Sequence, residues 1–213
     1  MRHLHVRIKD YLLANTNSII RVLILSDVCY IAGAGLLGPI FSLFVIDFIQ
    51  GGGAEVAGIA IAVYLVTKSL AQIPVGMIVD RVRGDVDDFW FMFGGLFVAS
   101  LVPISYLFIS TPLQLYAAEF VLGLALAVNF PPYMALFTKY VDENREATAW
   151  SIYFTISDFA SAGTAALGGL LATVVGFHAV IIGITCLGLI GTFSMLSIRH
   201  HLRPVPVKAD VNA

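Results

Sequence analysis

The sequence predicts an all-α membrane protein with six transmembrane helices, and its composition is the first reason. Of its 213 residues, 59% are hydrophobic and 12% are charged, whereas soluble domains are about 45–50% apolar and about 25% charged. The mean hydropathy is +0.90. A soluble globule with so few charged residues could not cover its surface, which excludes an ordinary cytosolic enzyme. The net charge of −2 lacks the basic excess of a nucleic-acid binder.

The second reason is the spacing of the apolar segments. A spanning helix needs about 20 predominantly apolar residues, and six segments provide them. Their approximate bounds are 22–49, 56–79, 89–109, 113–137, 147–175 and 179–198. We expect these six spans to form one transmembrane domain over residues 1–203, followed by a disordered tail over 204–213.

Turn and capping residues mark where the helices should begin and end. The glycines at 51–53 end the first helix, because glycine permits turns and weakens helices. Residues 85–88 offer aspartates as N-caps for the third helix. Thr111 and Pro112 suit the start of the fourth helix, and Gly176 ends the fifth.

The lysines and arginines predict the orientation. All of them except Lys68 lie in the N-terminal segment, the second loop, the fourth loop or the C-terminal tail. These four segments lie on one side of the membrane if there are six spans. Because cytoplasmic loops are enriched in lysine and arginine, both termini are expected to be cytoplasmic. The protein is then a multi-pass protein of the plasma membrane, in contact with the lipid bilayer.

The end of the second predicted helix carries the most specific motif. Gly76, Asp80 and Arg81 form the pattern Gly-x-x-x-Asp-Arg at the junction of the second and third helices. This pattern resembles the signature of the major facilitator superfamily. Three further features resemble the same family: residues 35–44 its first helix, residues 145–147 the start of its fifth, and Gly163, Gly168 and Gly169 its glycine-rich fifth helix.

The resemblance covers one six-helix half of a transporter that usually has twelve helices. It implies two three-helix inverted repeats. In agreement, Pro39 precedes Leu43-Phe44 at the same spacing as Pro132 precedes Leu136-Phe137. The missing half is expected to be a second copy of this chain, related by a two-fold axis along the membrane normal, or a separately encoded second half.

The motif also implies a cytoplasmic gate. A carboxylate there can pair with an arginine or a helix N-terminus in one state and release it in another. The family usually continues with a glycine and two basic residues, whereas this chain has Gly84 displaced and followed by Asp85. A loop that sets topology only is the alternative. The gating motif consists of Gly76, Asp80, Arg81 and Arg145.

Four ionisable side chains lie inside the predicted spans, namely Asp27, Lys68, Glu119 and Asp158. Such groups cost about 2.5–3.5 kcal/mol at the centre of a span and usually mark function. We interpret them as substrate- or proton-binding residues. Structural ion pairs, a near-interface position for Asp27 and snorkelling of Lys68 are the alternatives. Helical spacing predicts two polar or small-residue stripes: Tyr64, Lys68, Gln72 and Gly76, and Glu119, Gly123, Ala127 and Pro131.

Lys68 and Asp158 are at similar depth by residue count. In the family the two halves meet crosswise, through the second helix of one and the fifth helix of the other. We therefore expect Lys68 of one subunit to face Asp158 of a second copy. Pairing of the two residues within one subunit is the alternative.

These features predict a secondary transporter of a small solute or ion that works by alternating access, coupled to protons and active as a dimer. A non-transporting partner subunit or assembly factor with a degenerate half-transporter fold is the alternative. No nucleotide-binding or catalytic motif is present, so we expect neither an enzyme nor a cofactor. No metal site is expected either, because the five histidines lie at helix ends and in loops.

Overall fold

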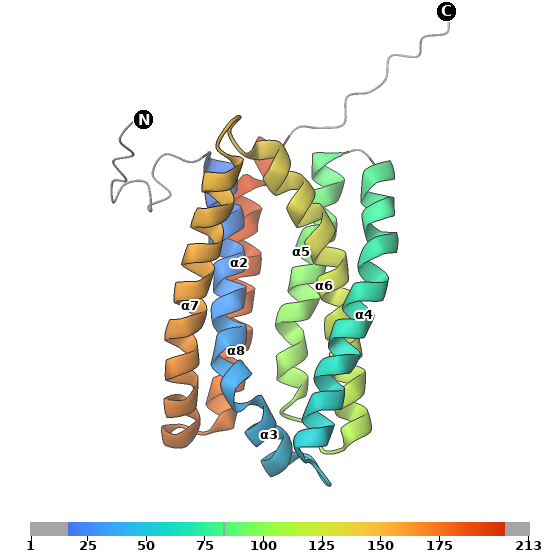
Figure 1. The fold of residues 1–213 in the computed structure, drawn as a ribbon, viewed down its shortest axis with the longest axis vertical. Helices are drawn as coiled ribbons and strands as arrows, with labels where there is room; N and C mark the ends of the chain where they lie inside the picture. Colours follow the sequence, from blue (N-terminus) through green and yellow to red (C-terminus); the bar gives the residue numbers. More distant parts are fainter. Residues whose placement is uncertain (1–16, 83, 203–213) are drawn as a thin grey trace, which may run out of the picture.

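The computed structural model describes residues 17–82 and 84–202, and within them all regular secondary structure is helical (Figure 1). The predicted tail, 204–213, lies outside the described residues. The elements are α2 (Ser18–Leu37), η2 (Gly38–Ile40), α3 (Phe41–Phe48), α4 (Ala54–Arg81), α5 (Asp85–Ser105), α6 (Pro112–Tyr140), α7 (Glu146–Val174), α8 (Phe177–Ser194) and η3 (Met195–His201).

Five of these helical segments are long and apolar enough to cross a membrane, which confirms an all-α membrane protein. They are Ser18–Phe48, Ala54–Arg81, Asp85–Ser105, Pro112–Tyr140 and Phe177–His201. The fifth predicted span is different. It forms α7, a helix of 29 residues that is long enough but not apolar enough, since it contains Asp158 among serines, threonines and glycines.

The first span is interrupted in its second half, contrary to one continuous helix over 22–49. The α-helix α2 ends at Leu37, a 3₁₀ turn follows over Gly38–Ile40, and α3 resumes at Phe41. Pro39 is the cause, because it has no N–H to donate and its ring clashes with the carbonyl of the residue four positions earlier. The chain still continues as one apolar segment.

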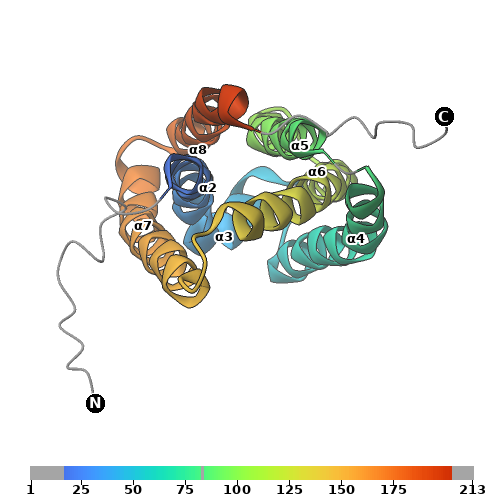
Figure 2. The same cartoon turned by 90° about the horizontal axis from the view of Figure 1, so that it is seen from above.

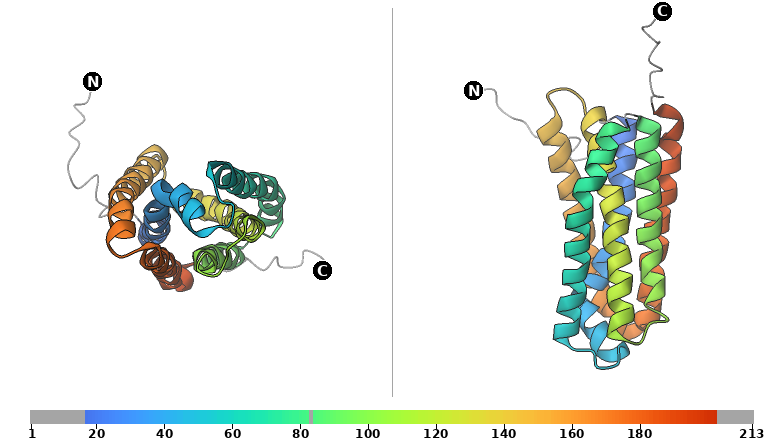
Figure 3. Two further views of the ribbon diagram at one scale, coloured as in Figure 1. Left: turned by 90° about the horizontal axis from the view of Figure 1, so that it is seen from below. Right: turned by 90° about the vertical axis from the view of Figure 1, so that its right-hand side faces the viewer.

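Two central helices organise the bundle (Figure 2). The helix α2 packs between α7 and α8, and α6 packs between α4 and α5. Contact between α5 and α8 joins the two groups. In the view from above, α4 and α7 lie at opposite edges of the bundle. The short helix α3 lies across one end, as the view from below shows (Figure 3).

Local capping explains several helix ends. The side chain of Thr111 accepts a hydrogen bond from the Gln114 amide in a capping box, with Pro112 in the first turn of α6. At the end of α7, Gly176 has a φ of 89°, which glycine adopts without strain. The expected aspartate cap of α5 is wrong: Gly84 is the N-cap, no side chain caps it, and Asp85 lies in the first turn.

Two apolar clusters close the two ends of the bundle. Phe44, Val45 and Leu115 belong to the cluster at the end that holds α3. Phe89 and Phe137 belong to the cluster at the opposite end. Glu119 lies within the first cluster, since Tyr106 and Leu115 belong to it and Leu122 packs against it.

Small residues allow close contact between the helices. A Cβ at Gly95 of α5 would lie 2.6 Å from the Ala125 carbonyl oxygen and 2.6 Å from the Asn129 amide nitrogen of α6. Beside it, the side-chain amide of Asn129 donates to the Met92 carbonyl oxygen at 2.9 Å. Gly95 is therefore required where α5 and α6 pack.

Gly95→Ala and Gly94→Ala form a matched pair that tests this packing. A Cβ at Gly94 meets no atom of the described residues within 4 Å. Gly95→Ala should lower the free energy of unfolding by about 1–3 kcal/mol, because backbone atoms must shift, and Gly94→Ala should not. Thermal unfolding of the purified protein in detergent measures both, and equal midpoints would contradict the α5–α6 contact.

Candidate functional site

A cavity of about 290 Å³ lies between α2, α4, α5, α6 and α8, lined mainly by apolar and aromatic side chains. Among its lining residues is Glu119, whose side chain is 4% exposed. The tyrosines Tyr30, Tyr64 and Tyr106 line the same cavity. An apolar cavity with a few convergent polar groups is the usual form of a small-molecule site.

Glu119 is bound on one of its two oxygens. The hydroxyl of Tyr106, directly after α5, donates to Glu119 Oε1 at 2.7 Å. No residue that the structure describes donates to the other oxygen, Oε2. Glu119 therefore keeps one acceptor for a ligand or a proton.

Asp27 is the centre of a second group of polar side chains, which lies closer to the N-terminal end of α2 than the cavity does. The hydroxyl of Tyr153 on α7 donates to Asp27 Oδ2 at 2.6 Å. Asp27 also interacts electrostatically with Lys68 of α4 and with Tyr133 of α6. The hydroxyl oxygen of Tyr133 is buried and has no hydrogen-bond partner among the described residues. Side chains from three other helices thus lie near the carboxyl group of Asp27.

Lys68 belongs to α4, contacts α6 and is half-buried. Its Nζ is 5.2 Å from the centroid of the Phe130 ring, a cation–π contact. A Cβ at Gly123 would lie 2.7 Å from the Tyr64 carbonyl oxygen and 3.2 Å from the Lys68 amide nitrogen. The stripe predicted on the second span therefore packs against the stripe predicted on the fourth.

Tyr30 lies near both carboxyl groups. It lines the cavity of Glu119 and is close enough to Asp27 to be affected by its charge. The cavity and the group around Asp27 are therefore neighbouring parts of one interior.

Asp158 does not join this interior. Its residue is exposed on α7, and no ion pair links it to Lys68 within the described chain. Figure 2 shows why, because α4 and α7 lie at opposite edges of the bundle. Pairing of Lys68 with Asp158 within one subunit is therefore wrong.

The residues of the predicted gating motif lie at or near one end of the bundle. Asp80 and Arg81 are exposed at the end of α4, and Arg145 is exposed directly before α7. Gly76 lies one turn deeper, where a Cβ would be 3.9 Å from Pro131 Cβ. The motif is thus divided between the two opposite edges of the bundle (Figure 2).

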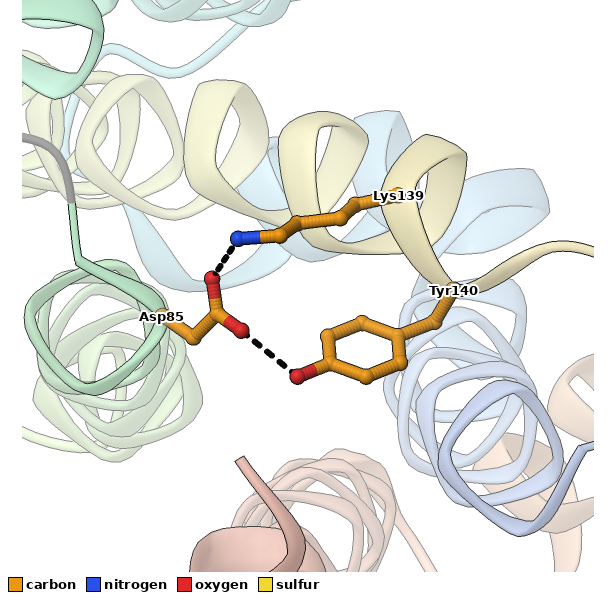
Figure 4. Close-up of polar contacts among 3 residues, drawn as sticks. All are labelled: Asp85, Lys139 and Tyr140. Atoms are coloured by element: carbon orange, nitrogen blue, oxygen red, sulfur yellow. Dashed lines mark hydrogen bonds and ion pairs between the residues drawn. The ribbon is translucent and has the colours of Figure 1, made fainter. Parts of the chain in front are cut away.

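At the same end, Asp85 links α5 to the end of α6 (Figure 4). Lys139 Nζ forms an ion pair with Asp85 Oδ1, and the Tyr140 hydroxyl donates to Asp85 Oδ2 at 2.6 Å. The Asp85 side chain is 2% exposed. A buried carboxylate satisfied on both oxygens is a fixed contact, so this altered part of the motif holds α5 against α6.

Sequence reasoning missed the tyrosines that partner the acids. Tyr106 and Tyr153 each donate to an ionisable residue that had been identified. A signal existed, because a tyrosine inside a span needs a partner for its hydroxyl. Lys139 and Tyr140 were also missed, because their role is to bind Asp85, a contact that the sequence does not reveal. Among the described residues, no group of three or more histidine, cysteine, aspartate or glutamate side chains can hold a metal ion.

A solved structure with the same fold is a transporter. Over 88% of this chain, the model matches the in meso crystal structure of the POT family transporter PepTSo with a TM-score of 0.71 and 17% sequence identity. The match covers 38% of that transporter, so this chain spans less than half of its length. A comparison with curated proteins finds no match.

The family model described as Major Facilitator Superfamily matches residues 23–212. This match confirms the resemblance inferred from the sequence motifs. The chain is a multi-pass membrane protein that belongs to the Major Facilitator Superfamily.

Proposed function

We propose that this chain is one half of a secondary transporter that moves a small solute by alternating access. The observation that carries the proposal is the buried carboxyl group of Glu119 in a cavity, inside a fold shared with a transporter. Discontinuous helices lining a midplane site are typical of such transporters, and the break at Pro39 lies beside the lining residues Leu37 and Gly38.

The helix packing supports two three-helix repeats in this half. The first three spans begin with α2, α4 and α5, and the last three are α6, α7 and α8. If each span is exchanged for its counterpart in the other set, the contact between α2 and α7 becomes the contact between α6 and α4. The same exchange converts α2–α8 into α6–α5 and leaves α5–α8 unchanged. A pseudo-symmetric pairing of this kind is what an inverted repeat requires.

A second copy of this chain is proposed to supply the other half. Asp158 is exposed near the middle of α7, and a charge facing lipid there would cost about 2.5–3.5 kcal/mol. The low hydropathy of α7 is explained if protein or water covers this face. A separately encoded half could fill the same position and is the second possibility.

Crosswise dimerisation would also complete the gate. Within one chain, Asp80 and Arg81 on α4 are separated from Arg145 before α7. If α4 of one copy meets α7 of the other, Asp80 comes close to Arg145 of the second copy. Such a pair can form when the cytoplasmic side is closed and break when it opens, with Gly76 providing close contact below it.

The orientation is proposed from charge. The described residues Arg21, Arg81, Lys139, Arg145 and Arg199 lie toward the end of the bundle where α4 ends and α5 begins. The loops at the other end, between 49 and 53, 106 and 111, and 175 and 176, contain no lysine or arginine. From the positive-inside rule we propose that the basic end faces the cytoplasm of a plasma-membrane protein, and that both termini are cytoplasmic.

Proton coupling is proposed for Asp27 and Glu119. Each accepts a hydrogen bond from one tyrosine hydroxyl, and each carboxyl group can bind and release a proton reversibly. The charges of Lys68 and Asp27 interact within the chain, so protonation of Asp27 would leave Lys68 to its proposed partner, Asp158 of the second copy. Asp158 is assigned to the dimer interface.

A non-transporting partner subunit is favoured by one observation. Asp85 stands in the altered part of the second-loop motif, and its buried contact with Lys139 and Tyr140 fixes the cytoplasmic end of α5 and α6. A chain that holds this end shut in every condition would assemble but not transport.

Thiol labelling distinguishes the two functions without a known solute. Ala34 lines the cavity, and Ala34→Cys is made in a chain with Cys29→Ala and Cys186→Ala. A membrane-impermeant maleimide should label it from outside in right-side-out vesicles and from the cytoplasmic side in inverted vesicles, because alternating access opens the cavity to each side in turn.

The matched control is Ile190→Cys, which is exposed on α8 and should be labelled from neither side. Labelling of Ala34→Cys from one side only, whatever the pH, would contradict transport and favour the partner-subunit function.

Charge reversal tests the dimer. Asp158→Lys and Lys68→Asp should each reduce the dimer fraction in mild detergent, and the double variant should restore it. Loss of one partner of a buried pair costs about 3–5 kcal/mol. Size-exclusion chromatography with light scattering measures the mass, and Asp47→Lys, a reversal on the exposed side of α3, should leave it unchanged. Failure of the double variant to dimerise would remove the proposed pair.

A further inference from the structure

We infer that the cavity beside Glu119 binds a small organic cation with one positive charge and apolar substituents, such as a quaternary ammonium. The inference rests on the proposed function and names its substrate class. Three properties of the cavity carry it: the charge of its lining, the aromatic rings around that charge, and its volume.

The charge of the interior favours a single positive charge on the solute. Of the lysines and arginines that the structure describes, Lys68 is the one that lies away from the helix ends, and its charge acts on Asp27. Lys68 is not a lining residue, and the lining contains no lysine, arginine or histidine. When deprotonated, Glu119 is therefore the one uncompensated charge of the lining, and a solute anion would meet it without a counter-ion.

The aromatic rings are suited to a cation with carbon substituents. Tyr30, Tyr64, Tyr106 and Phe41 line the cavity together with Glu119. Aromatic rings attract ammonium groups through their negative faces, and quaternary ammonium ligands are recognised by such groups of rings. The remaining lining residues are apolar or glycine, so they favour substituents without hydrogen-bonding groups.

The free oxygen of Glu119 fixes the place of the charge. Oε1 is already bound by Tyr106, and Oε2 has no donor among the described residues. A cation at Oε2 would contact the carboxylate and the tyrosine rings at once. The volume of about 290 Å³ is at the lower end of ligand cavities, about 300–1,000 Å³, so the solute is small.

Equilibrium dialysis of the purified full-length chain in detergent tests the inference. The probe is radiolabelled benzyltrimethylammonium, and micelles without protein correct for partitioning. Unlabelled neopentylbenzene, the neutral isostere, and benzenesulfonate, an anion of similar size, are the competitors. We expect saturable binding of the cation that neither competitor displaces.

Glu119→Gln should weaken this binding about ten-fold or more, as expected when a charged contact is lost. The control is Asp47→Asn, which removes an exposed carboxylate outside the cavity and should leave binding unchanged. The probe should also protect Ala34→Cys from maleimide. This second measurement keeps Glu119 intact and so applies even if Glu119→Gln fails to fold.

Three outcomes would overturn the inference: no saturable binding of the cation, equal competition by the neutral isostere, or undiminished binding by a folded Glu119→Gln. If Ala34→Cys is still labelled from both sides in that case, the transporter function stands and only the substrate class is wrong. If the cation binds but labelling stays one-sided, the substrate class stands and the transport function is wrong.

Discussion

A carboxyl group inside a membrane-spanning bundle needs a hydrogen-bond donor from another helix, and this constraint organises the interior of the protein. Glu119 on α6 accepts from Tyr106 directly after α5, and Asp27 on α2 accepts from Tyr153 on α7. Buried carboxylates without such partners would be strongly destabilising. Each acid therefore joins two helices at the level where the function is proposed.

The interior and the edges of the bundle differ in the way their charges are satisfied. Asp27 and Lys68 interact with each other inside the chain, whereas Asp158 on α7 is exposed. The proposed two-copy assembly would cover Asp158, because it brings α7 of one copy against α4 of the other.

Much of the architecture could be predicted from the sequence, because hydrocarbon forces the backbone of each span into a helix. The helix ends at Thr111 and Gly176 could also be predicted, because capping depends on neighbouring residues in the sequence. The side-chain pairs between different helices could not be predicted. Tyr153 is 126 positions from Asp27, and residue counts give the depth of a side chain but not the direction in which it points. For that reason the alternative that paired Lys68 with Asp158 within one subunit was wrong, although residue counts give the two side chains a similar depth.

Spectroscopic distances between two copies test the central claim most directly. One spin label is placed at Gln50→Cys or at Glu143→Cys, exposed residues at opposite ends of the bundle, in a chain with Cys29→Ala and Cys186→Ala. In a two-fold dimer each label gives one inter-copy distance. We predict that a change of pH moves the two distances in opposite directions, as rocking of two halves requires. Absence of dipolar coupling, or distances that do not change in opposite directions, would contradict a dimeric alternating-access transporter.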